Sequence, residues 1–338
     1  MIVLGVETSC DETSVGVVRD GDKILSNVIL SQEIHKDYGG VVPEIASRIH
    51  ITELVGITEK ALTRSGLSLE EIDGLAVTCG PGLVGCLLVG MSFVKSVHLA
   101  RGIPFVGVNH LESHIFAGKL DHPDLKTPHI ALVASGGHAN LYLVEDWGEY
   151  RLLGETRDDA PGEAFDKVAK LLGLGYPGGP EIEDAAAAGD PEFFRFPRAK
   201  MGAESFEFSF SGVKTAVSVY LRDKSSQFIK ENLPHLAASF QESVVEILTL
   251  KTLRAAEKFG IKQISVTGGV ARNGRLRDVF ESRKPSGVHV FFPSPELCTD
   301  NGAMVASCGA FHLARGERSD LELNAVPYLE LQYPPVSS

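Results

Sequence analysis

The chain has 338 residues, of which 43% are hydrophobic and 22% charged, a balance that excludes a disordered or collagen-like protein. At roughly 150 residues per domain, this length predicts about two globular domains. The 32 basic and 44 acidic residues give a net charge of −12, so overall charge cannot hold a nucleic acid. Five cysteines without a C-x-x-C spacing favour buried thiols in a reducing compartment over a disulfide framework.

Neither the N-terminus nor a long uncharged stretch predicts export or membrane insertion. The first apolar residues meet Glu7 and Asp11 at once, without the basic start or full apolar core of a signal peptide. Residues 74–94 are long enough to span a bilayer, but Gly-Pro-Gly at 80–82 breaks any helix there. We interpret this stretch as a buried strand, a turn and a buried helix, and we expect a cytoplasmic protein without a membrane partner.

The chain contains two copies of one pattern. Apolar runs at 1–7 and 15–18, joined by a small polar loop, predict a β-hairpin, and the runs at 128–134 and 139–144 repeat it. A helical pattern follows each hairpin, and then comes a strand that ends in Val-Thr-x-Gly and leads into another helix. This duplication predicts an α/β fold of two similar domains around a cleft.

We expect the first domain at 1–120 and the second at 121–338. Residues 175–215 fit neither copy, because they are rich in glycine, proline and phenylalanine. They are expected to form an insertion of loops and short helices over the cleft.

Three glycine turns directly follow apolar strands, at 80–82, 135–137 and 268–269. Without a Cβ, their backbone amides can approach an anion closely, and a following helix N-terminus adds positive potential. Any one of them alone is more simply an ordinary turn, but three on paired units favour a nucleotide site. Neither a Walker loop nor a strand-linked G-x-G-x-x-G occurs.

His110 and His114 stand four residues apart, so on a helix they share a face and can bind one divalent metal. Such a pair also arises by chance, and Glu112 stands at the third place, so the zinc-protease motif H-E-x-x-H is absent. Asp300, in Cys-Thr-Asp-Asn-Gly, is the candidate third ligand. An equal alternative is that it caps the helix that begins near Ala303.

Four acids crowd one segment: Asp158, Asp159, Glu163 and Asp166. They can bind a metal or a ribose hydroxyl. They also suit the first turn of a helix, where the macrodipole favours acids and Pro161 fits the first position. The residues alone leave both readings open.

Ten motifs, in order from residue 2 to about 330, resemble one family. They lie at 7–13, 38–44, 80–85, 109–114, 135–138, 162–167, 176–180, 208–215, 268–273 and 298–302. Together they are similar to the bacterial tRNA threonylcarbamoyladenosine transferase (TsaD) family, formerly called glycoprotease or Gcp. The resemblance implies a duplicated actin-like ATPase (ASKHA) fold, with two domains around a nucleotide cleft.

The resemblance also implies an acyltransferase that moves a threonylcarbamoyl group from threonylcarbamoyl-AMP to N6 of adenosine 37 of tRNA, releasing AMP. It implies one divalent metal per subunit on His110, His114 and Asp300, iron(2+) first and zinc as the alternative. Asp11 and Glu12 are the implied candidates for the general base. The residues that match the family's adenylate contacts are Val133, Ala134, Ser135, Gly136, Gly137, Asp166, Gly179, Glu183 and Asn273. Glu183 stands where many members carry Asp, which lengthens the arm toward a ribose hydroxyl.

The implied partners are tRNAs that read ANN codons, the shorter paralogue TsaB and the ATPase TsaE. The basic residues of the insertion, Arg195, Arg198 and Lys200, are expected to help hold tRNA, although a solvated loop is equally compatible. The competing classes are a metalloprotease, a small-molecule kinase on the same fold and a non-catalytic scaffold.

The helical pattern at Pro43–Ser65 is apolar on two sides. One predicted stripe, facing the sheet of its own domain, comprises Ile51, Leu54, Val55, Ala61 and Leu62. The other side carries Ile45, Ala46, Ile49, Gly56 and Ile57. Such a helix is either buried under a neighbour or an interaction surface. With the resemblance we expect it to pair with the paralogue, and we expect Ile49→Glu to disrupt that pair.

Overall fold

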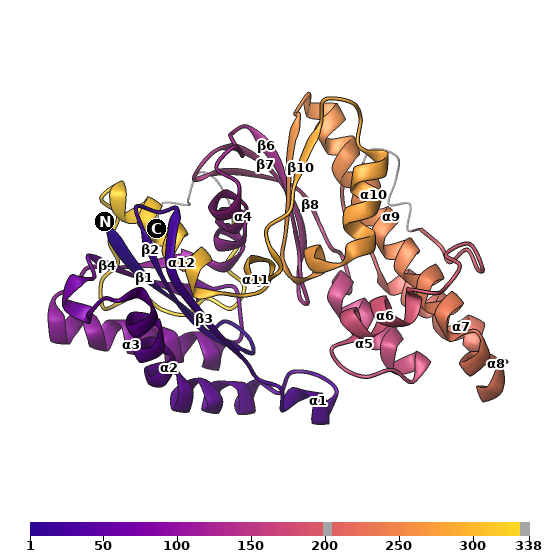
Figure 1. Cartoon of the computed structure of the whole chain (residues 1–338), viewed down its shortest axis with the longest axis horizontal. Helices are drawn as coiled ribbons and strands as arrows, with labels where there is room; N and C mark the ends of the chain where they lie inside the picture. The colour runs from indigo at the N-terminus through magenta and orange to yellow at the C-terminus, as the bar shows by residue number, and fades with distance from the viewer. Residues whose placement is uncertain (199–204, 332–338) are drawn as a thin grey trace. The chain divides into compact units, whose positions relative to one another are not determined.

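The computed structural model describes residues 1–198 and 205–331, which form two compact units (Figure 1). Unit 1 comprises Met1–Asp124 and Pro293–Leu331, and unit 2 comprises Leu125–Phe292. From the sequence, everything after residue 120 was expected in the second domain. The structure instead returns residues 293–331 to unit 1, because helix α12 (Gly302–Ala314) packs on the strands of that unit.

Each unit contains a five-stranded mixed sheet, and the two sheets have the same strand order. The order in unit 1 is β3 (Lys23–Ser31), β2 (Glu12–Arg19), β1 (Ile2–Glu7), β4 (Gly74–Gly80) and β5 (Phe105–Asn109). The order in unit 2 is β8 (Glu149–Glu155), β7 (Ala139–Asp146), β6 (His129–Ala134), β9 (Gln263–Thr267) and β10 (His289–Phe291). In both sheets the first three strands are antiparallel and the last three parallel. The predicted duplication is confirmed, and each predicted hairpin gains a third strand.

The helices of unit 1 are α1 (His35–Tyr38), α2 (Pro43–Ser65), α3 (Val84–Arg101), α4 (His110–Asp121), α11 (Pro295–Cys298) and α12. Those of unit 2 are α5 (Pro161–Leu172), α6 (Gly178–Ala186), α7 (Ser211–Leu221), α8 (Ser226–Glu231), α9 (Leu233–Phe259) and α10 (Gly274–Arg283). Short 3-10 turns lie at Leu69–Glu71 and Gly269–Arg272. The helix predicted at 43–65 is confirmed, and the helical pattern expected after the second hairpin includes α9.

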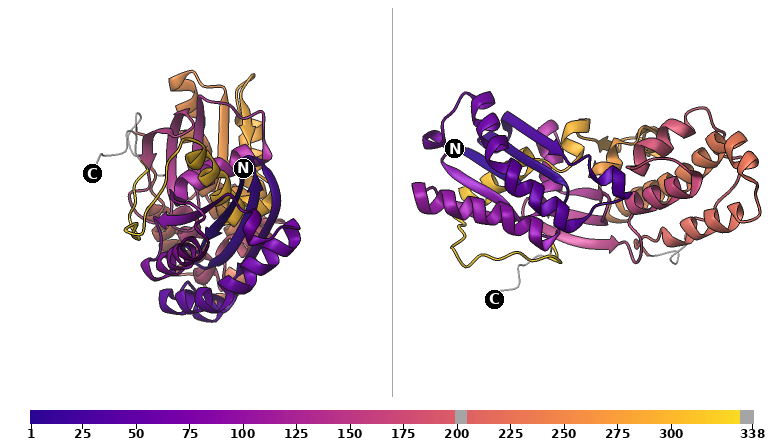
Figure 2. Two further views of the ribbon diagram at one scale, coloured as in Figure 1. Left: turned by 90° about the vertical axis from the view of Figure 1, so that its left-hand side faces the viewer. Right: turned by 90° about the horizontal axis from the view of Figure 1, so that it is seen from below.

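In unit 1, α12 and the pair α2–α3 cover opposite faces of the sheet. Gly5 and Gly16 are directly paired across β1 and β2, and a Cβ on either would collide with the backbone of α12. The alternate residues Leu4 and Val6 point to the other face, where they join the core formed with α2 and α3. The yellow α12 therefore lies against the indigo strands from the start of the chain (Figures 1 and 2).

The prediction for the faces of α2 is partly wrong. Ile51 and Val55 were expected to face the sheet, but they are 64% and 55% exposed. The buried residues of the helix are Ala46, His50, Leu54, Ile57, Thr58 and Ala61. Ala46 and Ile57 were expected on the opposite side, so that part of the prediction is also wrong. The buried positions form one face of the helix, and this face packs against the sheet. Ile51 and Val55 lie at the edge of this face, beside α3.

The uncharged stretch at 74–94 forms strand β4, a turn and the start of α3, as predicted. Among the described residues, α3 is the one helix long and apolar enough to cross a membrane. It packs against β4 and α2, and core helices of folded domains commonly pass the same test.

The stability of unit 2 is expected to fall in acid because of His129. This ring is completely buried, its Nδ1 lies 3.2 Å from the carbonyl oxygen of Lys126, and its Nε2 has no partner among the described residues. Burial lowers the pKa of His129 from 6.5 to about 4. The stability linked to the neutral His129 ring is therefore fully present above pH 6.5. It is lost as pH falls toward 4, because in this range the unfolded chain binds the proton and the folded chain does not.

Between pH 8 and pH 5, the wild type should lose about 2 kcal/mol more unfolding free energy than His129→Phe. Urea unfolding at several pH values measures this difference. His289→Phe, at an exposed position of β10, is the control. Parallel pH profiles for the wild type and His129→Phe would contradict the assignment.

Candidate functional site

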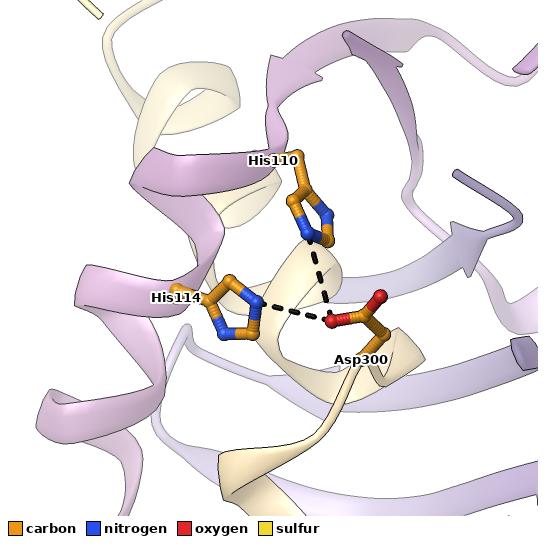
Figure 3. Close-up of side chains that lie close together, drawn as sticks. All are labelled: His110, His114 and Asp300. Carbon is orange, nitrogen blue, oxygen red and sulfur yellow. Dashed lines mark hydrogen bonds and ion pairs between the residues drawn. The ribbon is translucent and has the colours of Figure 1, made fainter. Parts of the chain in front are cut away.

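The histidine pair lies at the start of α4, directly after β5. The side chain of Asn109 caps this helix, because its Oδ1 accepts hydrogen bonds from the backbone N–H of Leu111 at 2.8 Å and of Glu112 at 3.3 Å. The cap begins the helix at the edge of the sheet, so His110 and His114 project from its first turns (Figure 3).

Both imidazoles point at one carboxylate oxygen. Asp300 Oδ1 lies 3.1 Å from His114 Nε2 and 3.5 Å from His110 Nε2 (Figure 3). The two rings are buried, and the side chain of Asp300 is 18% exposed. The cap of α12 is Asn301, whose Oδ1 accepts from the N–H of Met304, so the alternative role of Asp300 as a helix cap does not apply.

Glu7 holds His110 from the other side, and the sequence analysis assigned it no role. Its Oε2 lies 3.1 Å from His110 Nδ1 and accepts a hydrogen bond from the Thr78 hydroxyl at 2.7 Å. Its Oε1 accepts from the N–H of Ser9 at 2.6 Å. A carboxylate on Nδ1 fixes the orientation of a metal-binding histidine, leaving Nε2 as the ligand atom. The available sequence signal was a charged residue at the end of an apolar strand.

The charges of this cluster affect one another strongly. Burial alone would lower the pKa of His110, but Asp300 and Glu7 raise it to about 9. Burial, together with Asp11 and Asp300, raises the pKa of Glu12 well above its ordinary value. Asp11 and Glu12, the predicted general-base candidates, therefore belong to the same electrostatic cluster of unit 1 as the histidine pair.

His110, His114 and Asp300 fit a divalent metal. Their ligand atoms all lie within 4.8 Å of one another. Two imidazoles and one carboxylate form the donor set of non-haem iron(II) sites and also suit zinc, and they leave coordination positions for substrate or water.

The predicted adenylate residues all lie in unit 2, starting with the turn that follows β6. A Cβ added at Gly136 or Gly137 would meet no other atom within 4 Å, so space is open beside their backbone. The N-terminus of α5 packs under this turn, where the N–H of Gly162 donates to the carbonyl oxygen of Ser135 at 3.2 Å. Directly after the neighbouring strand β9, Gly268 adopts φ +90°, and a Cβ there would collide with the backbone of Ala134.

The remaining predicted residues connect α5, α6 and α10 through side-chain bonds to backbone. Asp166 Oδ1 accepts from the N–H of Gly178, next to Gly179, and Glu183 Oε1 accepts from the N–H of Gly274, both at 2.7 Å. Asn273 caps α10 by accepting from the N–H of Leu276. The side chain of Glu183, one methylene longer than Asp, thus reaches the backbone N–H of Gly274.

The other three acids of the crowded segment have structural partners. Asp158 accepts hydrogen bonds from the N–H groups at the start of α7, and Asp159 forms ion pairs with Lys167 and Lys214. Glu163 also pairs with Lys167, and Pro161 occupies the first position of α5 as predicted.

The basic residues of the insertion differ in their availability for tRNA. Arg198 forms a 2.5 Å ion pair with Glu246, whereas Arg195 is exposed. Lys200 lies outside the described residues.

The fold and the family of this chain are shown by its similarity to known proteins. Solved structures with the same fold include HypF of T. kodakarensis, with a TM-score of 0.64 and 13% identity over 93% of this chain and 48% of that chain. Component A of (R)-2-hydroxyglutaryl-CoA dehydratase from Acidaminococcus fermentans matches with a TM-score of 0.56 and 14% identity over 93% and 99%. These similarities agree with the duplicated sheets and confirm the actin-like ATPase fold class.

The family model of TsaD, tRNA N6-adenosine threonylcarbamoyltransferase, matches residues 23–307. A protein of that name from Caldicellulosiruptor bescii is 50% identical over 98% of each chain, and one from Syntrophotalea carbinolica is 52% identical over 96% of this chain and 95% of its own. The chain belongs to the TsaD family. It is a transferase that delivers a threonylcarbamoyl group to N6 of a tRNA adenosine.

His110→Ala and Asp300→Ala should each abolish binding of one equivalent of divalent metal, because each variant leaves too few donors at the site. Metal analysis after anaerobic loading and dialysis measures this loss, with circular dichroism as the check on folding. Glu7→Gln should weaken metal binding about 10- to 100-fold without removing a ligand.

His98→Gln, a change on α3 where His98 Nδ1 contacts the Ile103 carbonyl oxygen, is the control. Unchanged metal content in both ligand variants would remove the proposed site.

Proposed function

We propose that this transferase acts with one divalent metal per subunit, iron(2+) first and zinc as the alternative, held by His110, His114 and Asp300. The observation that carries the proposal is the approach of two Nε2 atoms to a single oxygen of Asp300. The carboxylate of Glu7 behind His110 supports it, since that contact is typical of metal-ligating histidines.

The reaction joins the N6 amine of adenosine 37 to the carbamoyl carbon of threonylcarbamoyl-AMP. The carbon–oxygen bond to the phosphate breaks, AMP leaves with that electron pair, and N6 loses a proton. Because the adenine amine is a weak nucleophile, catalysis depends on positioning and on stabilising the developing charge. When bound, the metal supplies Lewis-acid polarisation of the carbamoyl carbonyl or holds the threonyl end.

The protein's own residues divide the remaining tasks. The amides of the turn at 135–137 bind the phosphate, and Asp166 and Glu183 bind ribose hydroxyls. Asn273 completes the adenylate contacts. Asp11 and Glu12 are the candidates to accept the N6 proton.

The direct test supplies the purified chain and its partners with threonylcarbamoyl-AMP and unmodified tRNA that reads ANN codons, followed by nucleoside analysis. Modified adenosine should form on these tRNAs and not on a tRNA with guanosine at position 37. Gly136→Val should reduce AMP binding and transfer at least tenfold. Its fold should persist, because a Cβ there meets no other atom within 4 Å.

Gly136→Ala, which adds less volume, should give an intermediate loss. Full activity of Gly136→Val would exclude the turn as the phosphate site, and wild-type product on the guanosine-37 tRNA would exclude the assigned target.

We propose further that the α2–α3 face of unit 1 binds the shorter paralogue TsaB, that the ATPase TsaE joins the complex, and that the complex acts in the cytoplasm. The support is an open apolar groove of about 330 Å³ on this face, lined by Ile51, Leu54, Val55, Leu88, Val89, Ser92 and Phe93. Three of these apolar side chains, Ile51, Val55 and Leu88, are between 43% and 64% exposed. Ile49 is half-buried, so Val55 gives a cleaner test than Ile49→Glu.

Val55→Glu should abolish co-purification with the paralogue and reduce transfer activity to the level of the chain alone. The melting temperature of the isolated chain should stay unchanged, because Val55 is exposed. Lys60→Gln, at an exposed position on another side of α2, lowers the net charge by the same one unit and is the control. Retained binding by Val55→Glu would place the partner elsewhere.

A further inference from the structure

A second set of metal-type donors lies between α4 and α12, and the proposed function does not use it. Glu112 projects from α4, and Cys308 and His312 project from α12. Cys308 is completely buried and Glu112 is 5% exposed, whereas the His312 side chain reaches solvent with 17% exposed. All three belong to unit 1.

The ligand atoms of these residues converge. The carboxylate oxygen, the thiol sulfur and a ring nitrogen lie within 4.8 Å of one another, and Glu112 Oε2 is 2.9 Å from His312 Nε2. Cys308 and His312 are four residues apart, so they share one face of α12. This arrangement repeats the first centre with the helices exchanged, since there α4 supplies the pair and Asp300 arrives just before α12.

The far side of the His312 ring is also held. Its Nδ1 lies 2.8 Å from Glu317 Oε2, so a carboxylate anchors the ring and directs Nε2 toward Glu112 and Cys308. A carboxylate on one ring nitrogen and a metal on the other is the usual arrangement at zinc-binding histidines. Without a metal, His312 forms ion pairs with Glu112 and Glu317. These ion pairs do not account for the thiol of Cys308, which lies next to both ligand atoms.

We propose that Glu112, Cys308 and His312 form a second metal site, which takes zinc or another thiophilic divalent cation. Thiolate, imidazole and carboxylate together are typical zinc donors, and three protein ligands leave one position for water. On binding, the S–H bond of Cys308 breaks and a zinc–sulfur bond forms, while the displaced protons pass to solvent. The ion cross-links α4 to α12, the two helices that carry or adjoin the ligands of the first centre.

The test uses the full chain with the first centre disabled by His110→Ala and Asp300→Ala together. After loading with zinc and dialysis, this double variant should retain one zinc per chain, and the wild type two. Adding Cys308→Ser should reduce the double variant to none. Cobalt(II) in place of zinc should give a thiolate-to-cobalt charge-transfer band in the double variant, and Cys308→Ser should abolish it.

Cys86→Ser, at another fully buried cysteine of unit 1, is the matched control and should leave the zinc and the band intact. If Cys308→Ser does not fold, His312→Gln near the surface decides the question, because it must also remove the zinc. A double variant that binds no zinc, or a cobalt band that survives Cys308→Ser, would overturn the second site. Neither result depends on transfer activity, so the proposed function is tested separately.

Discussion

The packing of α12 on two glycines is the constraint on which the site in unit 1 depends. Gly5 and Gly16 lie opposite each other on β1 and β2, and the absence of both Cβ atoms lets the helix backbone rest on the sheet. The N–H of Gly302 at the start of α12 donates to the Ser14 hydroxyl at 2.8 Å, which fixes where the helix begins. Asp300 is thereby brought to His114, although 186 residues separate the two in the chain.

Helix α4 carries ionisable side chains into the interior on more than one side, which is unusual for an element that only stabilises a fold. Burial of a carboxylate costs free energy unless partners compensate it, and two buried acids of unit 1 each contact a histidine. Glu7 contacts His110, and Glu112 contacts His312. These pairs hold the two histidine rings in defined orientations. The ring nitrogen that could bind a metal is therefore fixed in position.

The sequence was sufficient for the duplicated architecture and for selecting His110, His114 and Asp300, which the structure brings together. It was insufficient for features that depend on long-range packing. The hairpins, the glycine turns and the spacing of His110 and His114 are local patterns, so they could be read directly. Three features depend instead on which surfaces pack together in the folded chain. They are the contact of Glu7 with His110, the membership of residues 293–331 in unit 1 and the exposure of Val55. Helical periodicity placed Val55 on the stripe expected to face the sheet, but only the packing of α2 decides which residues of the helix are buried. The sequence also could not decide whether Asp300 caps α12. The side chain of Asn301 occupies the cap position, and only the structure shows this.

Anomalous X-ray diffraction from crystals of the full chain loaded with iron(II) tests the metal assignment most directly. We expect an iron peak at about 2 Å from the Nε2 atoms of His110 and His114 and from a carboxylate oxygen of Asp300. Glu7 should remain on Nδ1 of His110. A fully loaded crystal without a peak between these three residues, or with His110 turned so that Glu7 contacts Nε2, would contradict the account.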